Sequence, residues 1–157
     1  MAALGVACFA HGQAQVIGWG GNTFQQTVRA PESLLPFSQI AGGTYHSIAL
    51  RRDGTVATWG GGSWGETVVP ANLSGVVQVA AGYQHSIAVK SDGTVVCWGA
   101  GTLNNGYSPQ YGQSIVPPNL TDVRQAAGGE FHTVALKQDG TVRCWGAGFT
   151  STGSTPE

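Results

Sequence analysis

The sequence predicts an all-β protein built from tandem repeats, and three observations support this fold class. Nearly the same stretch of sequence recurs three times, beginning at Gly43, Gly82 and Gly129. Each copy places an Asp-Gly pair between two short segments that alternate apolar with polar or small residues, a pattern typical of a β-hairpin. The chain is also rich in glycine, with 25 residues of that type, and only 10% of its residues are charged, which favours many tight turns.

The composition excludes several classes of protein. The formal net charge is -1 and Lys plus Arg number only 7, so we expect no nucleic-acid partner. No run of apolar residues approaches the roughly 18 that a membrane span needs. The cysteines show no CxxC or Cys/His spacing, and we expect neither a metal site nor another cofactor.

The first residues differ from the rest of the chain. A short apolar run is followed by the small residues Gly12 and Ala14, which fits the end of a secretory signal cleaved before Gln15. We therefore expect a signal-peptide remnant at 1–14, a repeat domain at 15–157, and a secreted, periplasmic or cell-surface protein. The alternative for 1–14 is a disordered or packed tail.

The repeat unit has one constant half and one variable half. His and Asp are always 7 residues apart, Asp and Trp always 6, and all variation in length follows the Trp. The shared positions are a Trp-Gly pair at Trp19, Trp59, Trp98 and Trp145, a histidine at His46, His85 and His132, and an Asp-Gly turn at Asp53–Gly54, Asp92–Gly93 and Asp139–Gly140.

Each unit resolves into four short strands. In the second copy, 85–89 and 94–98 form the hairpin, and 76–82 precedes it as a strand whose small residues suit a crowded innermost position. The segment 66–70 gives a fourth strand, which ends at Pro70 and so belongs at an edge. A period of about 40 residues with four antiparallel strands predicts a β-propeller blade.

The shared residues are expected to have structural roles. We expect each histidine to hydrogen-bond the backbone inside its own blade, with a metal triad as the alternative. The four tryptophans pack within blades, and the aspartates form turns. No nucleophile, base or pair of acids converges in this pattern, so we do not expect an enzyme.

The repeat, "VxQVAAGxxHSIAVxxDGTVxxWGxG", resembles the regulator of chromosome condensation repeat from about Val16 to Gly148. The resemblance implies a seven-bladed propeller, and the short period is most similar to compact bacterial members of that family, including the propeller-type beta-lactamase inhibitor protein. Three complete hairpin units and a partial one give an incomplete ring of three to three and a half blades. Either the chain is a fragment of a longer protein, or copies self-associate to complete a ring.

Loops on one face of the blades carry most of the aromatic residues. Because strands reverse at each turn, the loop before the histidine and the loop after Trp-Gly share one end of the blade. We expect this end to bind another protein, as in the related inhibitor, or, as the alternative, a glycan; the other possibility is that the rings fold inward and pack. The insertion 103–111 is the expected source of specificity. The candidate binding residues are Phe24, Tyr45, Trp64, Tyr83, Gln84, Tyr107, Tyr111, Glu130 and Phe131.

Overall fold

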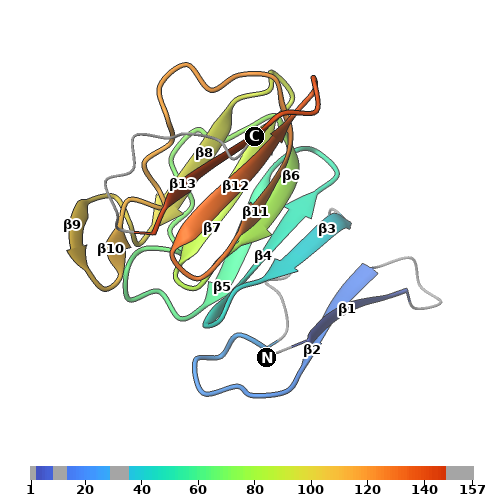
Figure 1. Cartoon of the computed structure of the whole chain (residues 1–157). Helices are drawn as coiled ribbons and strands as arrows, with labels where there is room; N and C mark the ends of the chain where they lie inside the picture. Colours follow the sequence, from blue (N-terminus) through green and yellow to red (C-terminus); the bar gives the residue numbers. More distant parts are fainter. Residues whose placement is uncertain (1–2, 9–13, 29–35, 148–157) are drawn as a thin grey trace.

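A computed structural model describes residues 3–8, 14–28 and 36–147 of the chain (Figure 1). Every regular element in these ranges is a β-strand, and the strands pair only in antiparallel fashion. Within these ranges no helix is long and apolar enough to cross a membrane. The all-β prediction is confirmed.

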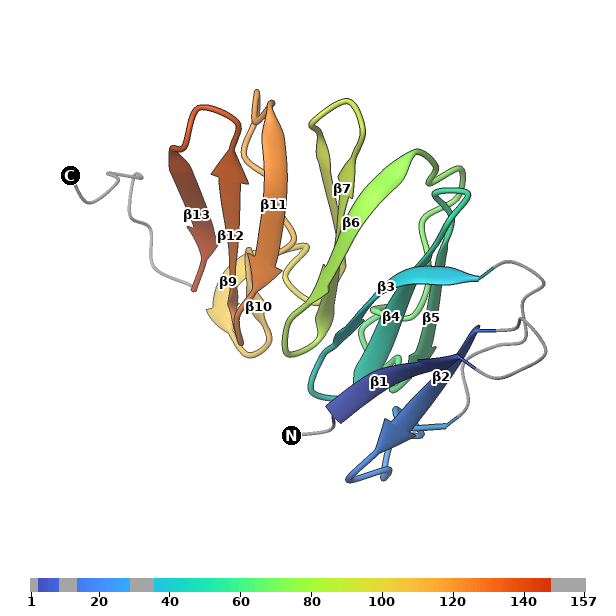
Figure 2. The ribbon, with the colours of Figure 1, turned by 90° about the vertical axis from the view of Figure 1, so that its right-hand side faces the viewer.

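Three sheets of three strands follow one another as propeller blades. Figure 2 shows the three sheets side by side, in a ring that does not close. The first blade is β3 (Phe37–Gly42), β4 (His46–Arg51) and β5 (Val56–Gly60); the second is β6 (Val76–Ala81), β7 (His85–Lys90) and β8 (Val95–Gly99); the third is β11 (Val123–Gly128), β12 (His132–Lys137) and β13 (Val142–Gly146).

The fourth strand expected at 66–70 does not form. The carbonyl oxygens of this segment accept hydrogen bonds from side chains of two blades instead of a strand ladder. Thr58 Oγ1 of the first blade donates to the carbonyl of Thr67 at 2.8 Å. Trp98 Nε1 of the second blade donates to the carbonyl of Glu66 at 3.0 Å. The segment therefore lies between the blades and joins them.

A two-stranded unit precedes the first blade. Strands β1 (Ala3–Cys8) and β2 (Ala14–Trp19) pair so that Ala3 lies opposite Trp19. In the first blade Ser47 lies opposite Trp59 in the same way. The unit therefore has the register of the outer two strands of a blade, while cleavage before Gln15 stays a prediction.

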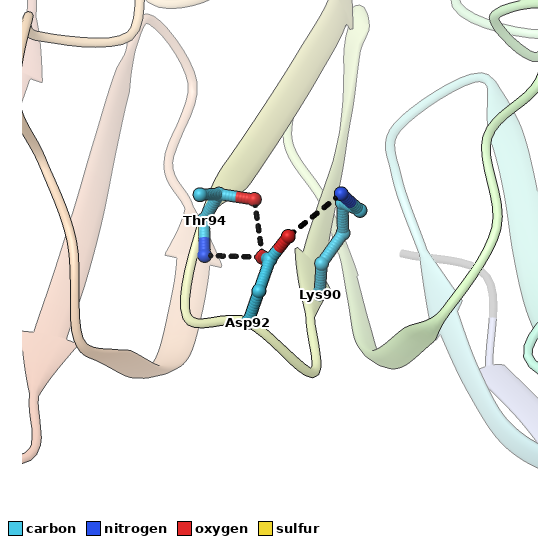
Figure 3. A network of polar contacts seen from close by, with 3 residues as sticks. All are labelled: Lys90, Asp92 and Thr94. Carbon is cyan, nitrogen blue, oxygen red and sulfur yellow. Dashed lines mark hydrogen bonds and ion pairs between the residues drawn. The ribbon is translucent and has the colours of Figure 1, made fainter.

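The Asp-Gly turns are built as the sequence predicts. In Figure 3, Asp92 Oδ1 accepts from the backbone nitrogen of Thr94 at 2.9 Å and from its hydroxyl, while Lys90 lies 2.9 Å from Oδ2. The Thr94 hydrogen bonds, followed by the contact with Lys90, hold the pKa of Asp92 well below its usual range. Asp53 and Asp139 accept hydrogen bonds from Thr55 and Thr141 in the same way. The glycines that follow the three aspartates, Gly54, Gly93 and Gly140, have φ of 81°, 78° and 87°.

Glutamines on the inner strands connect neighbouring blades. Gln39 Oε1 accepts from the backbone nitrogen of Val79 at 2.8 Å. Gln78 both accepts from the nitrogen and donates to the carbonyl of Ala126, each at 2.9 Å. The ladder shifts register beside each of these glutamines, as at a β-bulge, and such a bulge re-aims the side chain toward the next blade.

The apolar core lies between blades as well as within them. Ile48 of the first blade packs in one buried cluster with Val79 and Trp98 of the second. The second junction repeats this, with Ile87 beside Ala126. The first and second blades are therefore each stabilised by the blade that follows.

Replacing a tryptophan inside a blade should lower the free energy of unfolding much more than replacing a tryptophan in a loop. Trp98 is 6% exposed and Trp64 is 43% exposed. Trp98→Ala should lower the free energy of unfolding by roughly 3 to 5 kcal/mol, because it removes a buried ring. Trp64→Ala should change it by roughly 0.5 kcal/mol or less. Urea unfolding measures both, and equal losses would contradict this assignment.

Candidate binding face

Five aromatic rings form one continuous row across the blades. They come from the loop after β2, from the loops that precede the second strand of each blade, and from β10 (Gln110–Tyr111). Successive centroids are 4.5, 5.1, 5.5 and 4.8 Å apart, and each pair meets edge to face. The order of the row is Phe24, Tyr45, Tyr83, Phe131 and Tyr111.

The row is packed within itself and still reaches solvent. The hydroxyls of Tyr45 and Tyr83 are 2.9 Å apart, and this hydrogen bond is the largest cause of the raised pKa of Tyr83. Phe24 is 44% exposed and the other four rings are half-buried. Edge-to-face contacts fix the rings relative to one another, so the row presents a preformed surface.

Four candidate residues lie outside the row. Trp64 is 43% exposed and makes no ring contact with the row, and Tyr107 is 77% exposed on β9 (Asn104–Tyr107). Glu130 is exposed, and its charge contributes to the raised pKa of Tyr83. Gln84 is half-buried, and its backbone carbonyl accepts from the nitrogen of Ala100 at 2.8 Å.

Three buried side chains that the sequence analysis overlooked hold the loops of this face. Each one accepts a hydrogen bond from the backbone nitrogen of an aromatic residue two positions earlier. Gln26 accepts from Phe24 at 3.0 Å, Glu66 from Trp64 at 2.9 Å and Gln113 from Tyr111 at 3.0 Å. The available signal was a Gln or Glu, then Thr or Ser, then an aliphatic residue, in each repeat.

The backbone carbonyls of the same three residues accept hydrogen bonds from the following blade. The Glu66 carbonyl accepts from Trp98 Nε1 at 3.0 Å and from Ser86 Oγ at 2.9 Å. The Gln113 carbonyl accepts in the same way from Trp145 and Thr133, both at 2.9 Å. One residue thus fixes an aromatic loop with its side chain and a blade with its carbonyl.

His46 and His85 reach the next blade, so for these two histidines the prediction of a backbone partner in their own blade was wrong. His46 Nε2 lies 2.9 Å from Ser86 Oγ, and His85 Nε2 lies 3.1 Å from Thr133 Oγ1. Because the Ser86 proton goes to the Glu66 carbonyl, Nε2 of His46 must donate. Gly82, three residues before His85, leaves room for the His85 ring to reach the next blade. A Cβ on Gly82 would collide with that ring and with the Gly129 carbonyl.

Both of these histidines are held neutral. The pKa values of His46 and His85 are lowered to about 4, first by burial and second by the next histidine in the series. Nδ1 of each ring is buried and has no hydrogen-bond partner among the described residues, so an added proton there would gain no acceptor. In the described ranges no three His, Cys, Asp or Glu side chains converge to hold a metal ion.

These features define a class of protein, a β-propeller of repeat blades whose loops carry a row of aromatic rings. The chain belongs to the Regulator of chromosome condensation (RCC1) repeat family, whose pattern matches residues 37–65, 76–113 and 123–149. The family resemblance inferred from the repeat is therefore confirmed.

Several solved structures share the fold. The ectodomain of the Physcomitrella patens receptor kinase CR4 is 20% identical, with a TM-score of 0.67 over 84% of this chain and 35% of that one. Yeast RCC1 (Prp20) bound to Kap60 is 25% identical, with a TM-score of 0.64 over 84% of this chain and 38% of that one. Human WBSCR16 is 25% identical, with a TM-score of 0.67 over 85% and 42%. This chain therefore spans less than half of each. No curated protein sequence matches the chain.

The buried histidines predict that stability falls as the pH is lowered. Their folded pKa of about 4 lies below the unfolded value of 6.5, so the unfolded chain binds protons more readily. The free energy of unfolding should be highest above pH 6.5 and decrease down to pH 4, by an amount of the order of 3 kcal/mol for each histidine.

Urea unfolding at pH 7 and pH 4.5 measures this dependence. The variant His46→Gln/His85→Gln serves as the control because it removes both titrating rings. It should be less stable at pH 7 but vary less with pH. An unchanged dependence on pH in this variant would contradict the assignment.

Replacing Glu66 by glutamine, the residue found at the equivalent positions 26 and 113, should not destabilise the protein. The Glu66 side chain is 1% exposed. Gln26 and Gln113 accept the equivalent backbone hydrogen bonds with an amide in place of a carboxylate. Glu66→Gln should raise the free energy of unfolding at pH 7 by roughly 1 kcal/mol, because an amide costs less to bury. The reverse change, Gln26→Glu, should lower it. Thermal melting compares the two, and destabilisation by Glu66→Gln would contradict the prediction.

Proposed function

We propose that the chain is a non-catalytic module that binds another protein through the row of five aromatic rings. The observation that carries this proposal is the row itself, in which rings from four successive repeats meet edge to face. Aromatic side chains held in fixed positions supply large contact area at low cost in conformational entropy. Surface loops on a rigid scaffold are also a common location for binding sites.

The charge around the row supports a protein partner. The described residues of the aromatic loops include the exposed carboxylate of Glu130 and no Lys or Arg. The lysines and arginines of the blade turns, such as Lys90 and Lys137, lie at the opposite ends of the strands, beside Asp92 and Asp139. A largely apolar face with few charges resembles the centre of a protein interface more than a nucleic-acid surface.

The similar structures support the same class of function. Yeast RCC1 is bound to Kap60 in one structure, and a second describes binding of the yeast protein to Gsp1p and histones. By analogy with these proteins, the propeller of this chain acts as a protein-binding surface. The expected location outside the cytoplasm stays a prediction.

The β9–β10 hairpin would add specificity to the face. It follows β8 and projects beside the row, and its Tyr111 is the last ring of that row. Tyr107 and Leu103 of this insertion are 77% and 59% exposed. An insertion found in one repeat gives the face an asymmetric end against which a partner can be oriented.

A phage-displayed random peptide library selected on the protein tests the proposal. Peptides that bind should bind Tyr45→Ala and Phe131→Ala roughly 30-fold more weakly, as expected for anchor residues at the centre of an interface. Gln138→Ala, at the exposed turn on the opposite end of the third blade, is the control and should bind normally. Peptides unaffected by the ring variants would contradict the proposal, and selective binding on a glycan array without peptide binding would favour a carbohydrate ligand.

A further inference from the structure

The two interior junctions pair the same positions each time. At the first junction, Ile48, Leu50 and Val56 present their side chains to the second blade, where Trp98 packs in the same cluster. At the second junction, residues of β7 and β8 meet the third blade, where Trp145 packs in the same way. Each blade therefore has an outgoing apolar side and an incoming side marked by its tryptophan.

The outgoing side of the third blade is uncovered among the described residues. Val142 is 42% exposed, whereas Val56 and Val95, its equivalents at the interior junctions, are 9% and 8% exposed. His132 is exposed although His46 and His85 are completely buried. Cys144 is an exposed free thiol, while its equivalent Cys97 is half-buried and burial raises its pKa to about 12.

The incoming side of the β1–β2 unit is uncovered at the other end. Trp19 is 53% exposed, whereas Trp59 and Trp98 at the equivalent position are 7% and 6% exposed. Ile17 lies on the same side of β2 and is 42% exposed, while its equivalent Ala57 is 6% exposed. These two side chains form a second exposed apolar patch.

We propose that copies of this chain associate head to tail, with Trp19 of one copy packing against Val134, Leu136 and Val142 of the next. The occupant of the outgoing side is thus a second copy, because its incoming side offers the tryptophan that this side accepts at the interior junctions. The contact joins two different surfaces and is therefore heterologous, so further copies can add. This inference rests on the blade junctions and not on the aromatic row.

The contact would be weaker than an interior junction because it lacks the hydrogen bond between a histidine and a hydroxyl that the interior junctions have. At the interior junctions the histidine meets a hydroxyl, from Ser86 or Thr133. The register of β1 and β2 places Ala3 at the equivalent position, which offers His132 no hydroxyl. Association is therefore apolar and dependent on concentration.

Complementary variants test the proposal. Trp19→Asp removes the incoming patch and keeps the outgoing one, and Val142→Asp does the reverse. Sedimentation velocity at tens of micromolar, about the range where exposed apolar edges associate, should show wild type growing in size with concentration. Each variant alone should be monomeric, and a 1:1 mixture should form a dimer that does not grow further. Val68→Asp, at a position that is 68% exposed and away from both patches, should behave as wild type.

Several results would overturn the proposal. A wild-type monomer across the concentration range would do so, as would a 1:1 mixture that forms no dimer. Self-association of the double variant Trp19→Asp/Val142→Asp, which lacks both patches, would also overturn it. Circular dichroism checks the folding of each variant, and Trp19→Gln replaces Trp19→Asp if the latter does not fold. As a second readout, Trp fluorescence should shift to the blue with concentration in wild type, and this shift should be absent in Trp19→Phe.

Discussion

The structure depends on one carbonyl oxygen in each repeat that accepts two hydrogen bonds from the following blade. At Glu66 the donors are the indole of Trp98 and the hydroxyl of Ser86, and that hydroxyl accepts from His46 of the preceding blade. A buried carbonyl or hydroxyl without a partner costs free energy, so these groups specify how the blades sit on one another. The apolar layer between blades provides stabilisation, while the polar layer selects the arrangement.

The same residues connect blade packing to the aromatic face. Gln26, Glu66 and Gln113 use their side chains to hold the backbone of loops that carry rings of that face, and their carbonyls to hold the blades. A shift between blades would therefore displace the rings by a similar distance. Successive units differ in length only after the tryptophan, so Tyr45, Tyr83 and Phe131 keep equivalent positions in the row although one repeat carries an insertion. This coupling is how a simple repeat can present a continuous row of aromatic rings.

The sequence predicts what is local and leaves open what depends on contacts between repeats. The hairpins, the Asp-Gly turns and the tryptophan positions follow from fixed spacing, and the strand directions place Tyr45, Tyr83 and Phe131 on one end. The partner of His46 lies 40 residues away and depends on the stacking of two blades, so no local pattern reveals it. The strand expected at 66–70 is missing for the same reason, because donors from both adjacent blades take its carbonyls. Trp64 and Tyr107 lie in segments that follow a Trp-Gly pair, as Phe24 and Tyr111 do, but they make no ring contact with the row, and only side-chain positions decide such contacts.

The central claim is that the histidine and hydroxyl layer joins the blades, and a double-mutant cycle on His85 and Thr133 tests it most directly. Thr133→Val removes the hydroxyl with little change in shape, and His85→Gln removes the ring. Unfolding free energies of the wild type, both single variants and the double variant at pH 7 give the coupling between the two residues. The account predicts a coupling of about 1 kcal/mol or more, as expected for neighbours in one buried hydrogen-bond network. Additive losses, with a coupling below roughly 0.3 kcal/mol, would contradict it.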